Sequence, residues 1–235
     1  MPDRFLVIQH VAHEDAGVFG PMIPAAGFDP VVVHLHEQQP VPEDAGRFAG
    51  ILIMGGPMNV SQQELYPFIA EELKLIEQAA GENIPVLGVC LGAQLVAEAT
   101  GGRAYAGDEI EIGWYDVNLT GAGRKDKLFE GFPEKLTAFQ WHGQTFSPPL
   151  EGVLLAGSDS YPNQAFRAGS AWGVQFHLEV TAAHVKEWVR RSRDEVIQAG
   201  ADPDEIVARS GEHLAELTPL AGKMFGRFLE LCASK

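Results

Sequence analysis

The chain has 235 residues, of which 46% are hydrophobic and 21% are charged, and its formal net charge is -15 at pH 7. These values are ordinary for one soluble domain, and the acidity argues against a nucleic-acid surface, which requires a basic patch. No apolar stretch approaches the length of a membrane span, and no signal peptide precedes the first strand-like segment. Two widely separated cysteines do not form a disulfide framework, so we expect a reducing, cytoplasmic location.

The first hundred residues alternate between short apolar runs and helical patterns. Such runs predict strands buried on both faces, which belong in parallel sheets covered by helices. Ser61 and Glu64 have the spacing of a capping box, so we expect a helix from there to a stop at Gly81. The pattern predicts an α/β fold with a doubly wound, mostly parallel sheet flanked by helices, and a site at the carboxyl ends of its strands. The apolar runs are residues 5–9, 31–35, 51–54 and 84–89.

The last of these runs ends in the turn Gly88-x-Cys90-x-Gly92, and an alanine-rich helical stretch, residues 93–99, follows at once. This order is that of a nucleophile elbow, with sulfur in place of the hydroxyl of Gly-x-Ser-x-Gly. The glycines leave room in a strained turn. N–H groups at the head of a helix favour a thiolate and can hold an oxyanion. Cys90 is therefore a candidate nucleophile; the alternative is a small buried hydrophobic residue.

After Arg103 the sequence predicts a small β-rich excursion, followed by a last strand over residues 172–179. From Thr181 to the end it predicts helices, with a break before Asp202, a natural N-cap, and Pro203 at the first helical position. The strands of the excursion are expected at residues 110–117, 135–139, 153–156 and 164–166.

His177 and Glu179 are two residues apart on this predicted last strand, so both side chains would leave the same face. A carboxylate can fix the tautomer of an imidazole, and the imidazole can take a proton from a thiol. A histidine satisfied within the core is the alternative. The His-x-Glu pair together with a cysteine on an elbow favours the chemical role.

The segment Gly88-Val89-Cys90-Leu91-Gly92-Ala93-Gln94, together with Gln175-Phe176-His177-Leu178-Glu179, resembles the class I glutamine amidotransferases. The likeness is in particular to the glutaminase domain of GMP synthase and its stand-alone relatives, and it covers roughly positions 4 to 180. It implies a flavodoxin-like catalytic domain over residues 1–180. Residues 181–235 would form a C-terminal helical extension packed on the same domain.

The resemblance also implies a role for each residue that matches the family motifs. Cys90 would attack the γ-carbonyl of glutamine to give a γ-glutamyl thioester and ammonia, with His177 as general base and acid and Glu179 orienting the imidazole. The N–H groups of Gly56 and Leu91 would form the oxyanion hole. Substrate contacts are expected from Gly55, Gln94, Trp141, Gly143 and Gln144. Residues 141–144 match a substrate-binding loop of the family, and His142 is interpreted as a structural part of that loop.

One residue departs from the family pattern. Relatives of the GMP synthase type often carry an acidic residue where this chain has Gln144, and a neutral amide can only hydrogen-bond an α-ammonium group. The expected activity is hydrolysis of glutamine, with ammonia passed to a synthetase on another chain, because no synthetase segment or phosphate loop is present. An alternative is a γ-glutamyl peptidase or hydrolase acting on γ-glutamyl amines or peptides. A second alternative is a non-catalytic binding module.

No metal or other cofactor is expected. The histidine pairs His10 with His13 and His34 with His36 lack a convincing set of further ligands.

Overall fold

The computed structural model describes residues 3–234, and a single nine-stranded sheet runs through them in the order β2-β1-β3-β4-β9-β8-β7-β5-β6. Strands β2, β1, β3, β4 and β9 are parallel to one another. The strands are β1 (Arg4–Gln9), β2 (Asp29–His34), β3 (Gly50–Ile53), β4 (Val86–Val89), β5 (Arg103–Leu119), β6 (Lys135–Ser147), β7 (Val153–Gly157), β8 (Ala165–Ala168) and β9 (Ala171–Val174).

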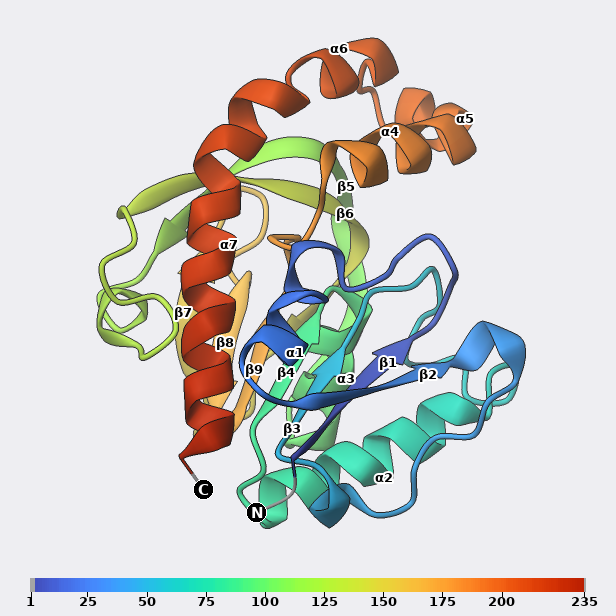
Figure 1. Cartoon of the computed structure of the whole chain (residues 1–235). Coiled ribbons are helices and arrows are strands. Elements are labelled where there is room, and N and C mark those ends of the chain that lie inside the picture. The colour runs from blue at the N-terminus through green and yellow to red at the C-terminus, as the bar shows by residue number, and fades with distance from the viewer. Residues whose placement is uncertain (1–2, 235) are drawn as a thin grey trace.

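Helices cover both faces of this sheet (Figure 1). No helix within residues 3–234 is long and apolar enough to cross a membrane. The α-helices are α1 (Met22–Ala25), α2 (Phe68–Gly81), α3 (Leu91–Ala99), α4 (Ala182–Arg191), α5 (Arg193–Gln198), α6 (Pro203–Ala208) and α7 (Ser210–Ala233), and the short 3-10 turns are η1 (Gly17–Phe19), η2 (Leu35–Glu37), η3 (Ala45–Arg47) and η4 (Gly123–Lys125).

Strand β1 separates two hydrophobic cores. Phe5 and Val7 belong to the cluster that contains residues of α7, whereas Leu6 and Ile8 belong to the cluster beneath α2 and α3. Successive side chains on a strand point to opposite faces, so an all-apolar strand supplies both cores at once. The predicted doubly wound α/β fold is confirmed.

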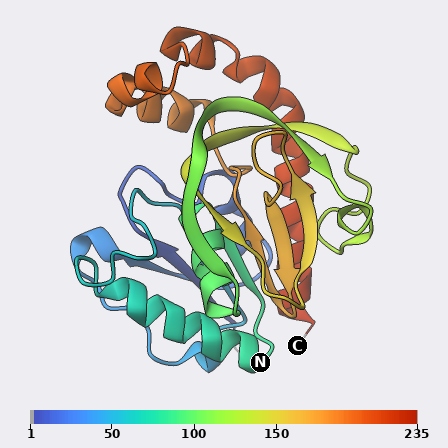
Figure 2. The ribbon, with the colours of Figure 1, turned by 180° about the vertical axis from the view of Figure 1, so that it is seen from behind.

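The β-rich excursion forms the antiparallel part of the sheet, from β8 to β6. Its two longest strands, β5 and β6, pair along most of their length, with a shift in register between Ala106 and Glu111. Figure 2 shows them as a long curved ribbon that reaches the helices of the C-terminal segment. There the Trp114 indole donates a hydrogen bond of 3.1 Å to the carbonyl of Ile206 on α6.

The C-terminal helix α7 packs against the face of the parallel sheet (Figure 1). The ring of Phe225 stacks on that of Phe19 at 4.4 Å between centroids and meets Phe5 edge-on at 6.1 Å. Phe228 adds a second edge contact with Phe5. We propose on these contacts that the C-terminal extension and the sheet fold as one unit.

Two predicted element boundaries are wrong. Helix α2 begins at Phe68, after Pro67, and not at a capping box formed by Ser61 and Glu64. Proline disfavours helical backbone in the residue before it but fits the start of a helix. The turn before Pro67 is therefore not part of α2. Strand β9 ends at Val174 and does not reach position 179. The predicted cap at Asp202, with Pro203 at the first helical position, is confirmed.

The contribution of α7 can be tested with Phe225→Ala. Removing this fully buried ring leaves a cavity, and we expect the free energy of unfolding to fall by about 3–5 kcal/mol. Urea unfolding followed by tryptophan fluorescence measures the change. A single transition that shifts as a whole is expected, and two transitions of which only one moves would contradict the proposal of one folding unit.

Candidate active site

Cys90 sits at the tip of β4, at the point where the chain turns into α3. Its backbone has φ 52° and ψ -106°, an unfavourable region for a residue with a side chain, and its N–H donates a hydrogen bond of 2.9 Å to Val174 on β9. A Cβ on Gly88 would lie 2.2 Å from the Gly92 carbonyl oxygen, and one on Gly92 would lie 2.2 Å from that of Ile53. Glycine is therefore required on both sides of the turn, which holds the thiol at the carboxyl end of the sheet.

His177 and Glu179 are brought together beside this thiol. The His177 Nδ1 lies 2.7 Å from Glu179 Oε1, and both side chains are buried. Because a carboxylate only accepts, Nδ1 is the donor. This leaves Nε2 as the ring nitrogen for the hydrogen bond between His177 and Cys90.

The sequence predicted that His177 and Glu179 lie on a regular strand, and this prediction is wrong. Beyond Val174 the chain leaves its ladder, and the His177 N–H donates a hydrogen bond of 2.8 Å to the Phe139 carbonyl on β6. This single bridge fixes the backbone of His177, and the irregular segment that follows carries Glu179 to the imidazole.

The surroundings of His177 favour its protonated form. Burial by itself lowers the pKa of the imidazole, but the negative charge of Glu179 and hydrogen bonds from the ring to Cys90 and Glu179 outweigh burial and raise the pKa well above 6.5. Trp188 from α4 packs edge-on against the imidazole, with 4.9 Å between ring centroids, and keeps it in place.

Two glutamine side chains form a buried chain to the sulfur. Gln175 Nε2 donates to Cys90 Sγ at 3.5 Å, and Gln94 Nε2 donates to Gln175 Oε1 at 3.2 Å. The Gln94 Oε1 atom is buried and has no hydrogen-bond partner among the described residues. Gln94 lines the pocket above Cys90, so this oxygen is available to a donor on a ligand.

The segment Gly55–Gly56 after β3 is held from behind by a buried pair. His10 Nδ1 lies 2.9 Å from the Gly55 carbonyl oxygen, and Nε2 lies 3.1 Å from Glu72 Oε1. Both partners accept hydrogen bonds, so both ring nitrogens donate and His10 is an imidazolium. Burial lowers the pKa of His10, but the charge and hydrogen bond of Glu72 outweigh burial and the net shift is upward.

This contact orients the peptide between Gly55 and Gly56. The described chain has no cis peptide bond, and in a trans peptide the carbonyl and the following N–H point in opposite directions. Because the Gly55 carbonyl is hydrogen-bonded to His10, the Gly56 N–H points in the direction opposite to that carbonyl. A Cβ on Gly56 would meet a Leu91 side-chain atom at 3.1 Å, so the two predicted oxyanion residues are neighbours. Leu91 is the first residue of α3, where an N–H has no acceptor within the helix.

A pocket of about 620 Å³ opens above Cys90, a size typical of small-molecule sites. Of the residues predicted from sequence, Gly56, Cys90, Gln94, Trp141, Gly143, Gln144 and His177 line it. Gly55 lies beneath it, where its Cβ would be 3.2 Å from His177 Cε1 and 3.5 Å from Cys90 Cβ. Glu179 lies behind the imidazole and Leu91 at the head of α3.

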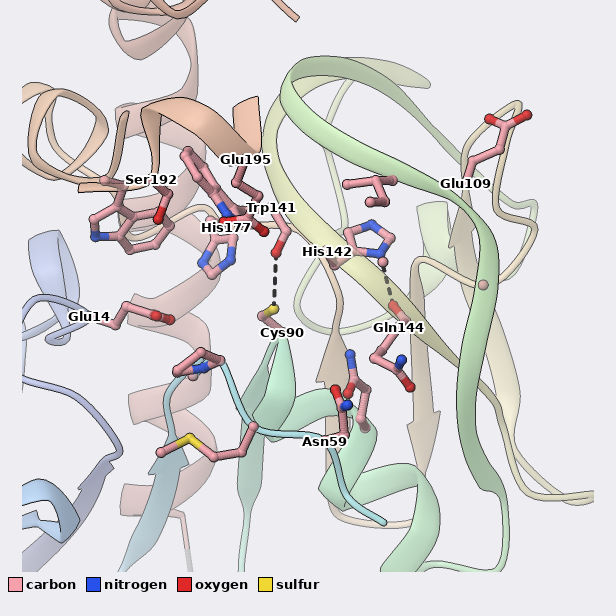
Figure 3. Close-up of a pocket in the computed structure, with 18 of the residues that line it drawn as sticks. Glu14, Asn59, Cys90, Glu109, Trp141, His142, Gln144, His177, Ser192 and Glu195 are labelled. Atoms are coloured by element: carbon pink, nitrogen blue, oxygen red, sulfur yellow. Dashed lines mark hydrogen bonds between the residues drawn. The ribbon is translucent and has the colours of Figure 1, made fainter. Parts of the chain in front are cut away.

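Positions 141–144 belong to strand β6, and the loop predicted there is wrong. The Trp141 carbonyl points to the Cys90 Sγ, 3.7 Å away (Figure 3). The His142 Nδ1 lies 2.9 Å from the Gln144 carbonyl oxygen, and Nε2 lies 3.1 Å from Oε2 of the buried Glu111 carboxylate. Glu111 also accepts from Gln164. His142 therefore stabilises the wall of the pocket, and its hydrogen-bond partners are Gln144 and Glu111 rather than the Cys90 sulfur.

Sequence reasoning missed several residues that surround the thiol. Glu14 approaches from the loop after β1, and Trp188 comes from the C-terminal extension. Burial raises the pKa of Glu14, while the positive charges of His177 and His10 act in the opposite direction. Glu14 and His10 follow a strand at the carboxyl edge of the sheet, which is the only sequence signal that points to them. Within residues 3–234, no three or more His, Cys, Asp or Glu side chains are grouped to hold a metal ion.

Comparison with known proteins identifies the family of the chain. The family model "Glutamine amidotransferase class-I" matches residues 23–193. The chain belongs to the class I glutamine amidotransferase family. It is 30% identical over 200 residues to the glutamine amidotransferase-like protein YfeJ of Salmonella typhimurium, covering 83% of this chain and 84% of that protein.

The same likeness extends to synthetases and to solved structures. A GMP synthase of Porphyromonas gingivalis is 33% identical over 143 residues, which are 60% of this chain and 26% of that enzyme. A glutamine amidotransferase of Thermotoga maritima superposes with a TM-score of 0.89 at 32% identity, covering 98% of this chain and 99% of that one. One from Methylobacillus flagellatus gives 0.89 at 30% identity, with 98% and 96% covered.

The His10–Glu72 pair predicts a pH-dependent term in stability. A folded pKa raised above the unfolded value of about 6.5 gives stability that is complete below that value and is lost as the pH rises through the folded pKa. Glu72→Gln removes the charge that raises it. We therefore expect the free energy of unfolding to fall with rising pH more steeply in wild type than in the variant, by up to about 1.4 kcal/mol per pH unit.

Urea unfolding at a series of pH values measures this difference. Subtracting the slope of the variant from that of wild type cancels the contribution of His177, which is present in both proteins. Glu77→Gln, which changes an exposed acid on the same helix, is the matched control and should keep the wild-type slope. Equal slopes for wild type and Glu72→Gln would contradict a charged His10.

Proposed function

We propose that this chain hydrolyses the γ-amide of glutamine, or of a γ-glutamyl amide, through a thioester on Cys90. The observation that carries the proposal is the buried row Glu179–His177–Cys90 at the floor of the pocket. A nucleophile, a base within reach of it and a carboxylate that orients the base are the arrangement of covalent amide hydrolysis.

In the first half of the reaction, the Cys90 sulfur attacks the γ-carbonyl carbon. His177 carries the proton that the thiol gives up and transfers it to the amide nitrogen, so that the carbon–nitrogen bond breaks and the amine departs. Glu179 stabilises the imidazolium that exists between these steps. With glutamine as substrate, the departing molecule is ammonia.

The negative charge that develops on the carbonyl oxygen needs donors that are already in position. We assign this role to the N–H groups of Gly56 and Leu91, which neighbour the thiol from β3 and from the head of α3. The contact from His10 to the Gly55 carbonyl orients the peptide that carries the Gly56 N–H. We assign His10 and Glu72 the role of positioning residues, which would form the hole in the isolated chain.

In the second half, water attacks the thioester carbon. His177 accepts a proton from that water and returns it to the sulfur as the thioester bond breaks, which releases glutamate. The glutamyl group would lie on the side of Gln94 and Gln144, where the unpartnered Gln94 Oε1 can accept from its α-ammonium group.

The destination of the ammonia is inferred from the relatives. The chain matches 26% of a GMP synthase that is described as glutamine-hydrolysing, and a relative from Pyrococcus abyssi is one separate subunit of a GMP synthase. A separate synthetase that accepts ammonia is therefore our proposed partner.

A second candidate is a γ-glutamyl hydrolase that works without a partner. The pocket continues past the thiol to Trp188 and Ser192 on the C-terminal extension. This space lies beyond what an ammonia leaving group occupies, which favours a larger amine.

Substitutions in the buried row test the proposed chemistry. Cys90→Ala should lower glutamate release by at least about 1,000-fold, because the attacking atom is gone, while the thermal unfolding temperature stays close to that of wild type. His177→Ala should be as severe. Glu179→Gln should retain a rate of glutamate release about 100-fold higher than that of His177→Ala, because the carboxylate only orients and stabilises the imidazole.

Glutamate release is measured from glutamine and from γ-glutamyl amides with the same protein samples. Substantial turnover by Cys90→Ala would remove the nucleophile assignment. A larger loss in Glu179→Gln than in His177→Ala would mean that the two roles are reversed.

A further inference from the structure

The pocket has a second half that glutamine hydrolysis does not use. His177 delivers its proton to the leaving nitrogen, so the leaving group departs on the His177 side of the sulfur. In Figure 3, Glu14, Ser192 and Glu195 lie on that side of Cys90, and Asn59 and Gln144 lie on the other. Trp188 and His13 complete the wall of this half, which we call the leaving-group side.

Carboxylates dominate the charge of this wall. Glu14 and Glu195 line the leaving-group side, and Asp108 and Glu109 also line the pocket. Among the lining residues in the described part of the chain there is no lysine or arginine. Such a lining repels an anionic leaving group and attracts a cationic one.

The arginines nearest in sequence to Glu195 are already paired with other acids. Arg190 and Arg191 both bind Glu187, and Arg193 binds Asp204 through two hydrogen bonds. Within residues 3–234, no lysine or arginine forms an ion pair with Glu14 or Glu195. Glu195 thus has no lysine or arginine partner within the described chain, and the positive charges that act on Glu14 are those of His177 and His10.

Glu14 is the member of this group closest to the reacting atoms. A Cβ added to Gly55 would lie 2.5 Å from Glu14 Oε2, next to the Cβ of Cys90 and the Cε1 of His177. No group among the described residues donates a hydrogen bond to this half-buried carboxylate.

A separate observation concerns the buried polar lining of the pocket. Gln94 is 2% exposed, its Oε1 has no partner among the described residues, and the residue lines the same cavity as Glu14. One end of a ligand can thus satisfy Gln94 while its other end reaches Glu14, with the scissile amide over Cys90 between them.

We propose that the leaving-group side binds a cationic amine, so that the preferred substrate is a γ-glutamyl amide of a diamine or polyamine. This proposal rests on the thioester chemistry assigned to Cys90 and adds the substrate class. The amide carbon–nitrogen bond breaks as in glutamine hydrolysis, and the nitrogen receives its proton from His177. The distal ammonium stays bound by Glu14 and Glu195, with its methylene chain against Trp188.

Three matched substrates test the proposal: the γ-glutamyl amides of a straight-chain diamine, of the alkylamine of equal length and of the ω-amino acid of equal length. Glutamate release gives kcat/KM for each with the full chain. We expect the diamine amide to exceed the alkylamine amide by about tenfold and the amino-acid amide to be the poorest. The diamine preference should weaken at high salt, because exposed Glu195 is screened.

Glu14→Gln and Glu195→Gln locate the effect. Each should lower the ratio of diamine to alkylamine turnover, and Glu14→Gln should lower it more because its carboxylate is the less exposed of the two. Glu77→Gln, an exposed acid on α2 that does not line the pocket, is the control and should leave the ratio unchanged. Labelling of Cys90 by a chloroketone analogue of glutamine verifies that each variant is folded around the thiol.

The possible results separate this proposal from the one on which it rests. Equal turnover of the three amides, or a preference for the anionic one, would overturn the cationic leaving group while leaving the Cys90 chemistry intact. Efficient turnover of glutamine alone would overturn it as well. Failure of Cys90→Ala to abolish turnover would overturn the thioester mechanism itself.

Discussion

The strained turn at Cys90 is the constraint on which the rest of the site depends. A residue with a side chain is held at φ 52° between β4 and α3, a cost of about 1–3 kcal/mol that the surrounding sheet must offset. Close packing enforces the turn, because Gly88 touches the Gly92 backbone and Gly92 touches that of Ile53. The turn brings the sulfur, the head of α3 and the Gly55–Gly56 segment to one point, so the proposed nucleophile and the assigned oxyanion donors share a single rigid support.

Buried charge holds the groups around this turn in place. His177 binds Glu179, His10 binds Glu72, and in both pairs the carboxylate raises the pKa of the imidazole against the effect of burial. Such pairs are costly to separate, because either partner alone would be an uncompensated buried charge. The first pair faces the sulfur, and the second faces the backbone of the segment that we assign to the oxyanion hole. Trp188 links the first pair to the C-terminal extension, so the same helices that complete the hydrophobic core also form the leaving-group side of the pocket.

Sequence alone predicted the parts of the molecule that depend on local pattern. The buried strands, the strand–turn–helix order around Cys90 and the cap at Asp202 each follow from a few adjacent residues. It did not predict features that depend on contacts between distant segments. His177 is placed by a bridge to Phe139 and not by a continuous strand, and positions 141–144 lie in β6 because β5 pairs with them. Glu14 and His10 carry no motif, so only the fold reveals that their loop reaches the thiol.

We propose that the isolated chain holds a reactive Cys90 next to a preformed oxyanion hole. The most direct measurement uses the aldehyde analogue of glutamine, labelled with carbon-13 at the carbonyl carbon and observed by NMR with the purified protein. We expect a bound tetrahedral carbon, the hemithioacetal of Cys90, that is absent from Cys90→Ala. A bound aldehyde that stays trigonal, or the same tetrahedral signal in Cys90→Ala, would contradict it.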